Sequence, residues 1–103
     1  MNKEKEYLTC TNVTFYGVTD EEMFFEWVKM IAAIESFEKS GSELYLILKN
    51  NQLSEDDLYE ILYLFQRYKI DMKQLRRFLT EENKKLFFKA KKAYWYKPLF
   101  GDA

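Results

Sequence analysis

The chain has 103 residues, of which 48% are hydrophobic and 18% aromatic, and its formal net charge at pH 7 is −1. This composition excludes a disordered chain and predicts that residues 1–103 form one small domain with a hydrophobic core. The near-neutral total conceals two opposite halves, because residues 1–65 carry 13 acids and 5 bases whereas residues 66–103 carry 4 acids and 11 bases.

The first third of the chain predicts a strand followed by a long helix. Residues 1–6 are expected to be a disordered tail, and residues 7–16 favour a strand because they are rich in threonine, valine and aromatic side chains. Thr19, with Glu22 three positions later, is predicted to cap a helix that extends to about Lys39. Few positions of this helix are polar, so we expect it to be covered on more than one side.

The remaining elements are predicted to be one more strand and three more helices. Residues 43–49 favour a strand, and the order strand-helix-strand indicates a right-handed crossover between parallel strands. Ser54, Asp71 and Thr80 are expected to cap three helices, the last covering residues 81–93. The predicted class is α+β with an α/β-like start: a small sheet of two to three strands covered by about four helices, in the order β-α-β-α-α-α.

The residue types needed for catalysis are scarce. The chain has no histidine and only one cysteine, Cys10, so a Cys-His catalytic pair and a disulfide within the chain are excluded. Three glycines are too few for a phosphate-binding loop. The acids Glu55, Asp56 and Asp57 are explained by the start of a helix rather than by a metal site. We therefore expect no enzyme activity, no metal and no cofactor, and the single cysteine and the absence of an apolar span predict a cytoplasmic protein without a membrane segment.

Charged and aromatic residues are the candidates for partner contact. Basic side chains crowd the last third of the chain among aromatic ones, a pattern that suits an acidic surface or a phosphate. The alternative is that the basic side chains form a solvent-exposed helical face and the aromatic side chains among them enter the core. The segment 94–100 is open to three interpretations: a helix end, a short edge strand or an exposed anchor. We favour a segment that folds back onto the core over one that forms a partner surface. The candidate partner-binding residues are Arg76, Arg77, Lys84, Lys85, Lys89, Trp95, Tyr96, Glu26 and Glu60.

In its size, its lack of catalytic residues, its strand-helix-strand-helix opening and its acidic runs at residues 20–22 and 55–57, the chain resembles the small immunity proteins of bacterial polymorphic toxin systems, such as contact-dependent growth inhibition. These proteins share no common motif, so no residue role is carried over. The resemblance implies that the chain neutralises a cognate toxin by direct binding.

Two other functions remain open on the sequence. The basic last third favours a nucleic-acid-associated protein. The nearly all-round apolar helix predicted after Thr19 favours a small regulatory or structural homo-oligomer, so the oligomeric state is left undetermined.

Overall fold

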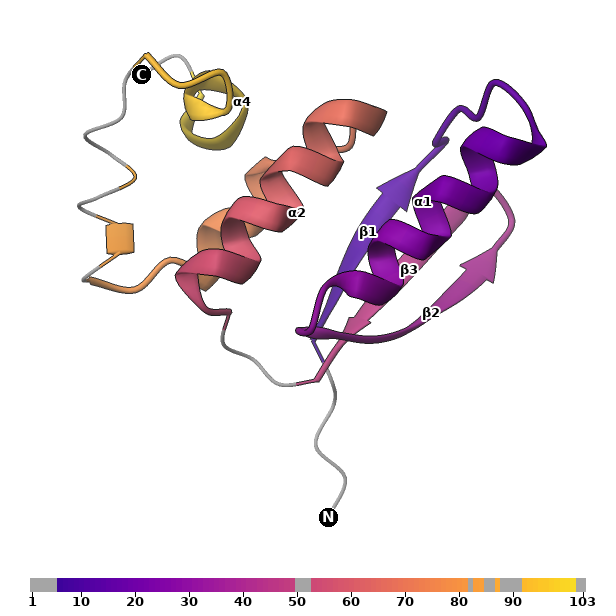
Figure 1. The fold of residues 1–103 in the computed structure, drawn as a ribbon. Helices are drawn as coiled ribbons and strands as arrows, with labels where there is room; N and C mark the ends of the chain where they lie inside the picture. Colours follow the sequence, from indigo (N-terminus) through magenta and orange to yellow (C-terminus); the bar gives the residue numbers. More distant parts are fainter. Residues whose placement is uncertain (1–5, 50–52, 82, 85–86, 88–91, 102–103) are drawn as a thin grey trace.

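The first half of the chain folds into an antiparallel sheet with a helix packed on it (Figure 1). The structure, a computed structural model, describes residues 6–49, 53–81, 83–84, 87 and 92–101. The sheet has three strands, β1 (Tyr7–Thr11), β2 (Ile34–Ser40) and β3 (Glu43–Leu48), in the spatial order β1-β3-β2. Both strand pairs are antiparallel, so the predicted parallel crossover is wrong, whereas the predicted α+β class with a small sheet is confirmed.

The helix α1 (Val18–Met30) is shorter than the sequence predicts. Its chain becomes extended at Ile31, with φ −84° and ψ 111°, and the residues expected to continue the helix to Lys39 form β2 instead. A two-residue loop that begins with Gly41, at φ 61°, folds β2 back onto β3. A glycine with positive φ in the first loop position is a favoured hairpin geometry, so pairing with β3 overrides the helix propensity of residues 32–39.

The start of α1 also differs from the expectation. Gly17, not Thr19, is the N-cap residue, and no side chain forms a capping hydrogen bond there. The carboxylate of Asp20 accepts a hydrogen bond from the backbone N–H of Tyr16 at 3.0 Å. The predicted capping box of Thr19 is therefore wrong, and Asp20 ties the preceding loop to the first turn.

One face of the sheet packs against the helices and forms one side of the hydrophobic core. Alternate residues of β1 and β3 point toward the helices and are buried, whereas Tyr45 and Ile47 on the opposite face are only half-buried. The buried set is Leu8, Cys10, Leu44, Leu46 and Leu48. This alternation is typical of an antiparallel sheet with helices on a single face.

The helix α2 (Glu55–Tyr68) begins where the sequence predicts. The Ser54 hydroxyl accepts a hydrogen bond from the backbone N–H of Asp57 at 3.1 Å, which confirms the predicted N-cap. The helix ends at Lys69, which adopts a left-handed conformation with φ 58°. Its buried face consists of Leu58, Ile61, Leu62, Leu64 and Phe65.

A short 3-10 helix, η1 (Lys73–Phe78), closes the outer edge of β1. The side-chain amide of Gln74 donates to the carbonyl of Thr9 and accepts from its N–H, both at 2.8 Å. Arg77 donates to the carbonyl of Tyr7 at 2.6 Å and forms an ion pair with Glu6 at 3.4 Å. The carbonyl of Glu6 accepts from Leu48, so Glu6 belongs to the fold rather than to the predicted tail; residues 1–5 lie outside the described residues.

The C-terminal segment folds back against the core. Thr80 and Asn83 exchange side-chain hydrogen bonds with each other's backbone N–H, which is the pattern of a helix start, and most of the predicted helix 81–93 lies outside the described residues. The helix α4 (Tyr96–Phe100) follows, so residues 94–100 form neither an edge strand nor an exposed anchor. Trp95 is 4% exposed and Leu99 is 1% exposed. In the part of the chain that the structure describes, we find no helix with the length and apolar character needed to cross a membrane.

Burial of Cys10 leads to a testable prediction about its reactivity. Burial raises the pKa of the Cys10 thiol from 9.0 to about 12. We expect the folded protein to resist thiol reagents at mildly alkaline pH and the denatured protein to react fully, because only the thiolate is nucleophilic. Since the folded state holds the proton more tightly, the contribution of this group to stability is present below pH 9.0 and is lost as the pH rises to about 12. Rapid labelling of the native protein would contradict this placement of Cys10.

Candidate functional site

The helices α1 and α2 lie side by side and run in opposite directions on the sheet (Figure 1). Near the end of α1, the indole Nε1 of Trp27 donates to the Glu60 carboxylate at 3.4 Å. Near its start, the Tyr68 hydroxyl donates to the Asp20 carboxylate at 3.1 Å. These two contacts hold the helices together at both ends of their shared boundary, so their outward residues form one continuous surface.

This surface combines apolar side chains with negative charge. Met23, Trp27 and Met30 lie at positions i, i+4 and i+7 of α1 and therefore share one face of the helix. Met23 is 64% exposed and Met30 is 82% exposed. Each of the two helices carries four acids and one base, a net charge of −3 for each helix. We call this the acidic two-helix surface, made of Met23, Glu26, Trp27, Met30, Asp56, Glu60 and Tyr63.

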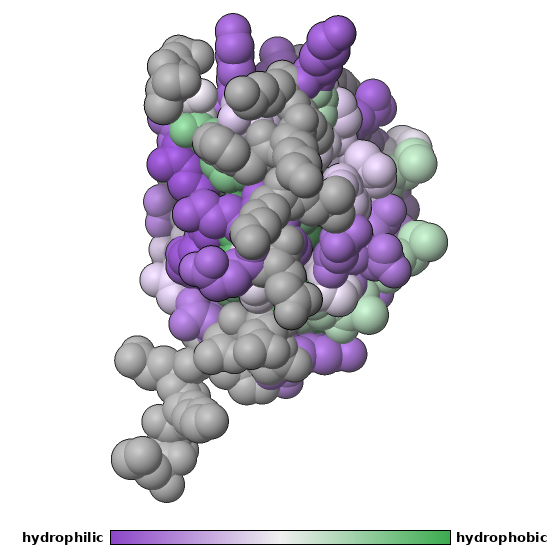
Figure 2. All heavy atoms as spheres, turned by 90° about the vertical axis from the view of Figure 1, so that its left-hand side faces the viewer, coloured by the Kyte–Doolittle hydropathy of each residue, from purple (hydrophilic) through white to green (hydrophobic). Residues whose placement is uncertain are grey.

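Aromatic side chains extend the acidic two-helix surface toward the C-terminal segment. Tyr63 on α2 is 44% exposed and Tyr94 is 46% exposed, and their ring centroids lie 6.4 Å apart. Tyr59 stacks on Tyr63, with ring centroids 6.5 Å apart. Figure 2 views the molecule from the left-hand side of Figure 1. Among the described residues on this face, hydrophilic side chains dominate, and a few hydrophobic ones project along one border.

The structure places the two acidic candidates on neighbouring helices. Glu26 is exposed on α1, where it pairs with Lys29 at 3.2 Å, and Glu60 is exposed on α2, where it accepts the hydrogen bond from Trp27. They are separated by 34 positions in the sequence. Sequence reasoning missed Trp27 and Met30 as surface residues. The signal was present, because α1 has more apolar residues than one buried helix face can hold, so some of them must be exposed.

The two arginine candidates have internal roles. The Arg76 guanidinium donates to the carbonyl of Leu99 and thereby connects η1 to α4. Arg77 binds the carbonyl of Tyr7 and packs over the Phe78 ring, with its guanidinium carbon 4.7 Å from the ring centroid. These hydrogen bonds give both side chains a role in the fold, and because both remain exposed, their contact with an acidic partner stays a prediction.

The other C-terminal candidates are placed as follows. Trp95 is buried against Phe87, with ring centroids 5.2 Å apart, which corrects its assignment as a partner contact. The half-buried Tyr96 ring packs on Phe100 at 5.0 Å. Lys84 is exposed. Lys85 and Lys89 lie outside the described residues.

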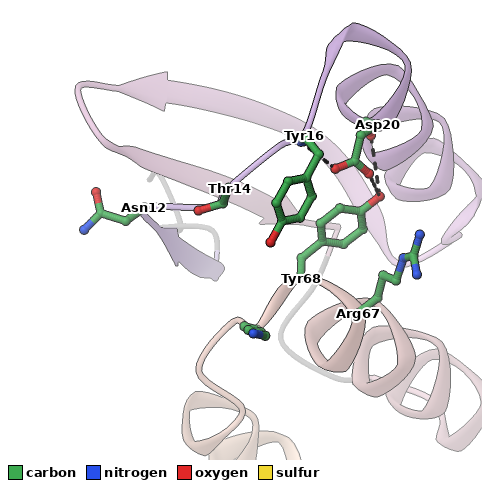
Figure 3. Close-up of a pocket in the computed structure, with 7 residues that line it drawn as sticks. Asn12, Thr14, Tyr16, Asp20, Arg67 and Tyr68 are labelled. Carbon is green, nitrogen blue, oxygen red and sulfur yellow. Dashed lines mark hydrogen bonds between the residues drawn. The ribbon is translucent and has the colours of Figure 1, made fainter.

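A polar pocket of about 540 Å³ lies beside the acidic two-helix surface, between the loop after β1 and the end of α2. Figure 3 shows Asp20 and Tyr68 pointing toward each other across it, with Arg67 next to Tyr68. Burial, followed by the hydrogen bond to Asp20, raises the pKa of the Tyr68 phenol against a smaller opposing effect of Arg67. The phenol therefore remains protonated at neutral pH and serves as a donor. Since Asp20 already accepts from Tyr68 and Tyr16, the pocket joins α1 to α2 rather than presenting a free base.

The candidate site is thus a surface for another macromolecule, defined by exposed apolar side chains among acids. Within the described ranges, no three acidic or cysteine side chains come together as a group of metal ligands. Comparisons of the chain with protein-family models, with curated proteins and with solved structures give no match.

Proposed function

We propose that the chain is a non-catalytic protein-binding domain of the immunity type, which neutralises a cognate toxin by direct binding through the acidic two-helix surface. The observation that carries this proposal is that exposed Met23 and Met30 on α1 and exposed Tyr63 on α2 accompany Glu26 and Glu60 on two helices joined by the bond between Trp27 and Glu60. The toxin is expected to present a basic surface, as a nuclease does.

Physical chemistry supports this use of the surface. An exposed methionine side chain supplies contact area that adapts to the partner, and an exposed tyrosine ring supplies rigid contact area. Both residue types are enriched in protein interfaces. The surrounding carboxylates would steer a basic partner toward the surface and accelerate the encounter. The bond between Trp27 and Glu60 holds two members of the surface in place before binding, which lowers the entropy lost on association.

The experiment begins with the gene next to the one that encodes this chain. A toxin domain encoded there should bind the purified chain in a 1:1 complex by calorimetry, and its activity should be lost when the chain is added. A neighbouring toxin that binds neither tightly nor specifically would contradict the proposal. Retention on DNA that weakens steeply with salt, together with no toxin binding, would instead favour the nucleic-acid function.

Charge reversal on the surface gives the corresponding prediction. The variants Glu26→Lys and Glu60→Lys should each weaken toxin binding about tenfold, and together about a hundredfold, because each places a positive charge opposite a basic partner. Glu26 is exposed, so Glu26→Lys should change the free energy of unfolding by about 0.5 kcal/mol or less. Glu60→Lys also removes the acceptor of the Trp27 indole and should cost about 1 kcal/mol. Isothermal titration calorimetry measures the affinities, and urea denaturation checks the fold.

Glu81→Lys provides the matched control, because it makes the same charge change at an exposed position outside the acidic two-helix surface. Its toxin affinity should stay within about twofold of the original chain. Equal losses in all three single variants would show that net charge, rather than this surface, determines binding.

A further inference from the structure

The polar pocket between the loop after β1 and the end of α2 holds two positive charges (Figure 3). Arg67 and Lys69 line it, and no ion pair between described residues includes either of them. The acid in the described lining, Asp20, accepts from the Tyr68 hydroxyl at 3.1 Å and from the backbone N–H of Tyr16 at 3.0 Å. The described lining therefore has a net charge of +1 and offers two cations that lack an anionic partner.

Two residues of this pocket have an uncommon backbone conformation. In the described part of the chain, Asn12 and Lys69 are the two non-glycine residues with positive φ, at 53° and 58°, and both line the pocket. Asparagine adopts this conformation readily, whereas lysine does not. A residue that served only to end α2 would be glycine or asparagine, and Arg67 already supplies the cation that the negative end of a helix favours. Backbone strain of this kind gathers at ligand sites, so Lys69 points to a ligand rather than to helix termination.

Neutral donors complete the lining. The Thr14 hydroxyl, the Asn12 side-chain amide and the Tyr16 phenol line the pocket, and none of them has a hydrogen-bond partner among the described residues. Figure 3 shows these residues on the loop after β1, opposite the end of α2 that carries Arg67 and Tyr68. The Tyr16 side chain is 90% exposed, so its ring forms an uncovered aromatic rim beside the two cations.

We propose that this pocket binds a small phosphate monoester whose body carries hydroxyl groups, such as a sugar phosphate. A phosphate monoester has a charge of about −1.5 to −2 at pH 7, which Arg67 and Lys69 together neutralise. The planar guanidinium donates to two phosphate oxygens at once, and the ammonium group adds a compact point charge. A carboxylate, with a single negative charge, would leave one of the two cations without a partner.

The size and the chemistry of the pocket indicate that the ligand is larger than a phosphate ion. The volume of about 540 Å³ lies in the range of small-molecule sites, roughly 300 to 1,000 Å³. The Thr14 hydroxyl and the Asn12 amide suit the hydroxyl groups of a sugar, and the Tyr16 ring offers a flat surface for its carbon face. Asp20 does not compete for the cations, because Tyr68 and Tyr16 already occupy its carboxylate.

Isothermal titration calorimetry of the full chain with three probes at constant ionic strength tests the proposal. Ribose 5-phosphate should bind in a saturable 1:1 complex, inorganic phosphate should bind about tenfold more weakly, and ribose should not bind measurably. No saturable binding of ribose 5-phosphate up to about 10 mM would overturn the proposal. Inorganic phosphate that binds as tightly as the ester would overturn the assignment of the sugar body to the pocket.

Two substitutions assign the binding to this pocket. Arg67→Gln and Lys69→Asn should each weaken the binding of ribose 5-phosphate about tenfold, because each removes one of the two charges. Asparagine tolerates the left-handed conformation, so Lys69→Asn removes the ammonium group and retains the end of α2. Lys73→Asn is the matched control, because it makes the same charge change at an exposed position that does not line the pocket, and its affinity should stay within about twofold. Equal losses in all three variants would overturn binding at this site.

The exposed ring of Tyr16 separates the two parts of the ligand. Tyr16→Ala should weaken the binding of ribose 5-phosphate about tenfold and that of inorganic phosphate by less than about twofold, because the ring contacts the sugar and not the phosphate. An unchanged affinity for the ester would overturn this role of the ring. Arg67, Lys69 and Tyr16 lie outside the acidic two-helix surface, so failure of this experiment and failure of toxin binding are distinguishable.

Discussion

Replacing Phe65 with alanine should lower the free energy of unfolding by about 3 to 5 kcal/mol. The side chain is fully buried on α2, and its backbone carbonyl accepts from the N–H of Ile70 at 2.9 Å where the helix ends. The loss has two sources: the apolar surface no longer transferred from water, and the cavity that rigid neighbours cannot fill. Urea denaturation followed by circular dichroism measures it.

Tyr63→Ala is the control for this prediction, because Tyr63 lies on the same helix two positions earlier but is 44% exposed. It removes an aromatic ring of similar size while leaving no closed cavity, so it should cost about 1 kcal/mol or less. If both variants unfold at the same urea concentration, the inward face of α2 is assigned incorrectly.

Replacing Trp95 with alanine should cost about 3 to 5 kcal/mol and should leave toxin affinity unchanged under conditions where the protein is folded. The indole is 4% exposed and packs edge-on against Phe87, with Tyr59 of α2 at 6.2 Å. It therefore joins the C-terminal segment to α2, and its removal opens a cavity between them. A partner anchor would behave in the opposite way, losing affinity at constant stability.

Tyr94→Ala is the matched control, because this neighbouring ring is 46% exposed and should cost about 1 kcal/mol or less in the free energy of unfolding. The readout for Trp95→Ala should include near-ultraviolet circular dichroism as well as backbone signals, since the C-terminal segment can detach before α2 and the sheet unfold. A Trp95→Ala variant with normal stability and lost toxin binding would return Trp95 to the binding surface.

Local signals in the sequence identified several elements correctly. Ser54 caps α2, and the amphipathic spacing that follows it matches the buried face of that helix. Thr80 pairs with Asn83 as at a helix start. The predicted cap at Asp71 is wrong, because Met72 is the N-cap of η1 and no side chain caps it, although the Asp71 carboxylate accepts from the N–H of Lys73 at 3.0 Å. Such signals are readable because a cap and its partner lie within four positions of each other.

The strand β2 shows where local signals fail. In residues 34–40, five of the seven are Glu, Ser or Lys and only Ile34 is β-branched, and six of the seven are exposed. Their strand conformation depends on the backbone of β3, which propensity does not encode. The loop beginning with Gly41 was the available hint of a hairpin.

Prediction of the surface met the same difficulty. The clustering of bases indicated a partner site, which stays a prediction, and gave no sign that Arg76 and Arg77 also bind the carbonyls of Leu99 and Tyr7, which lie 23 and 70 positions away in the sequence. A count of charges does not show which backbone acceptors the fold brings near them. The acids Glu26 and Glu60 were identified singly, and only the packing of α1 against α2 shows that they share a surface with exposed methionines.

The closure of β1 by Gln74 has a consequence for the growing polypeptide on the ribosome. The residues that pair across this edge are separated by 65 positions, so β1 leaves the ribosome long before the side chain that covers it. During that interval the nascent chain presents an open strand edge, which is the kind of segment that associates with other chains and with chaperones. Closure of this edge thus waits for Gln74 and Arg77, which are made later in translation than all three strands.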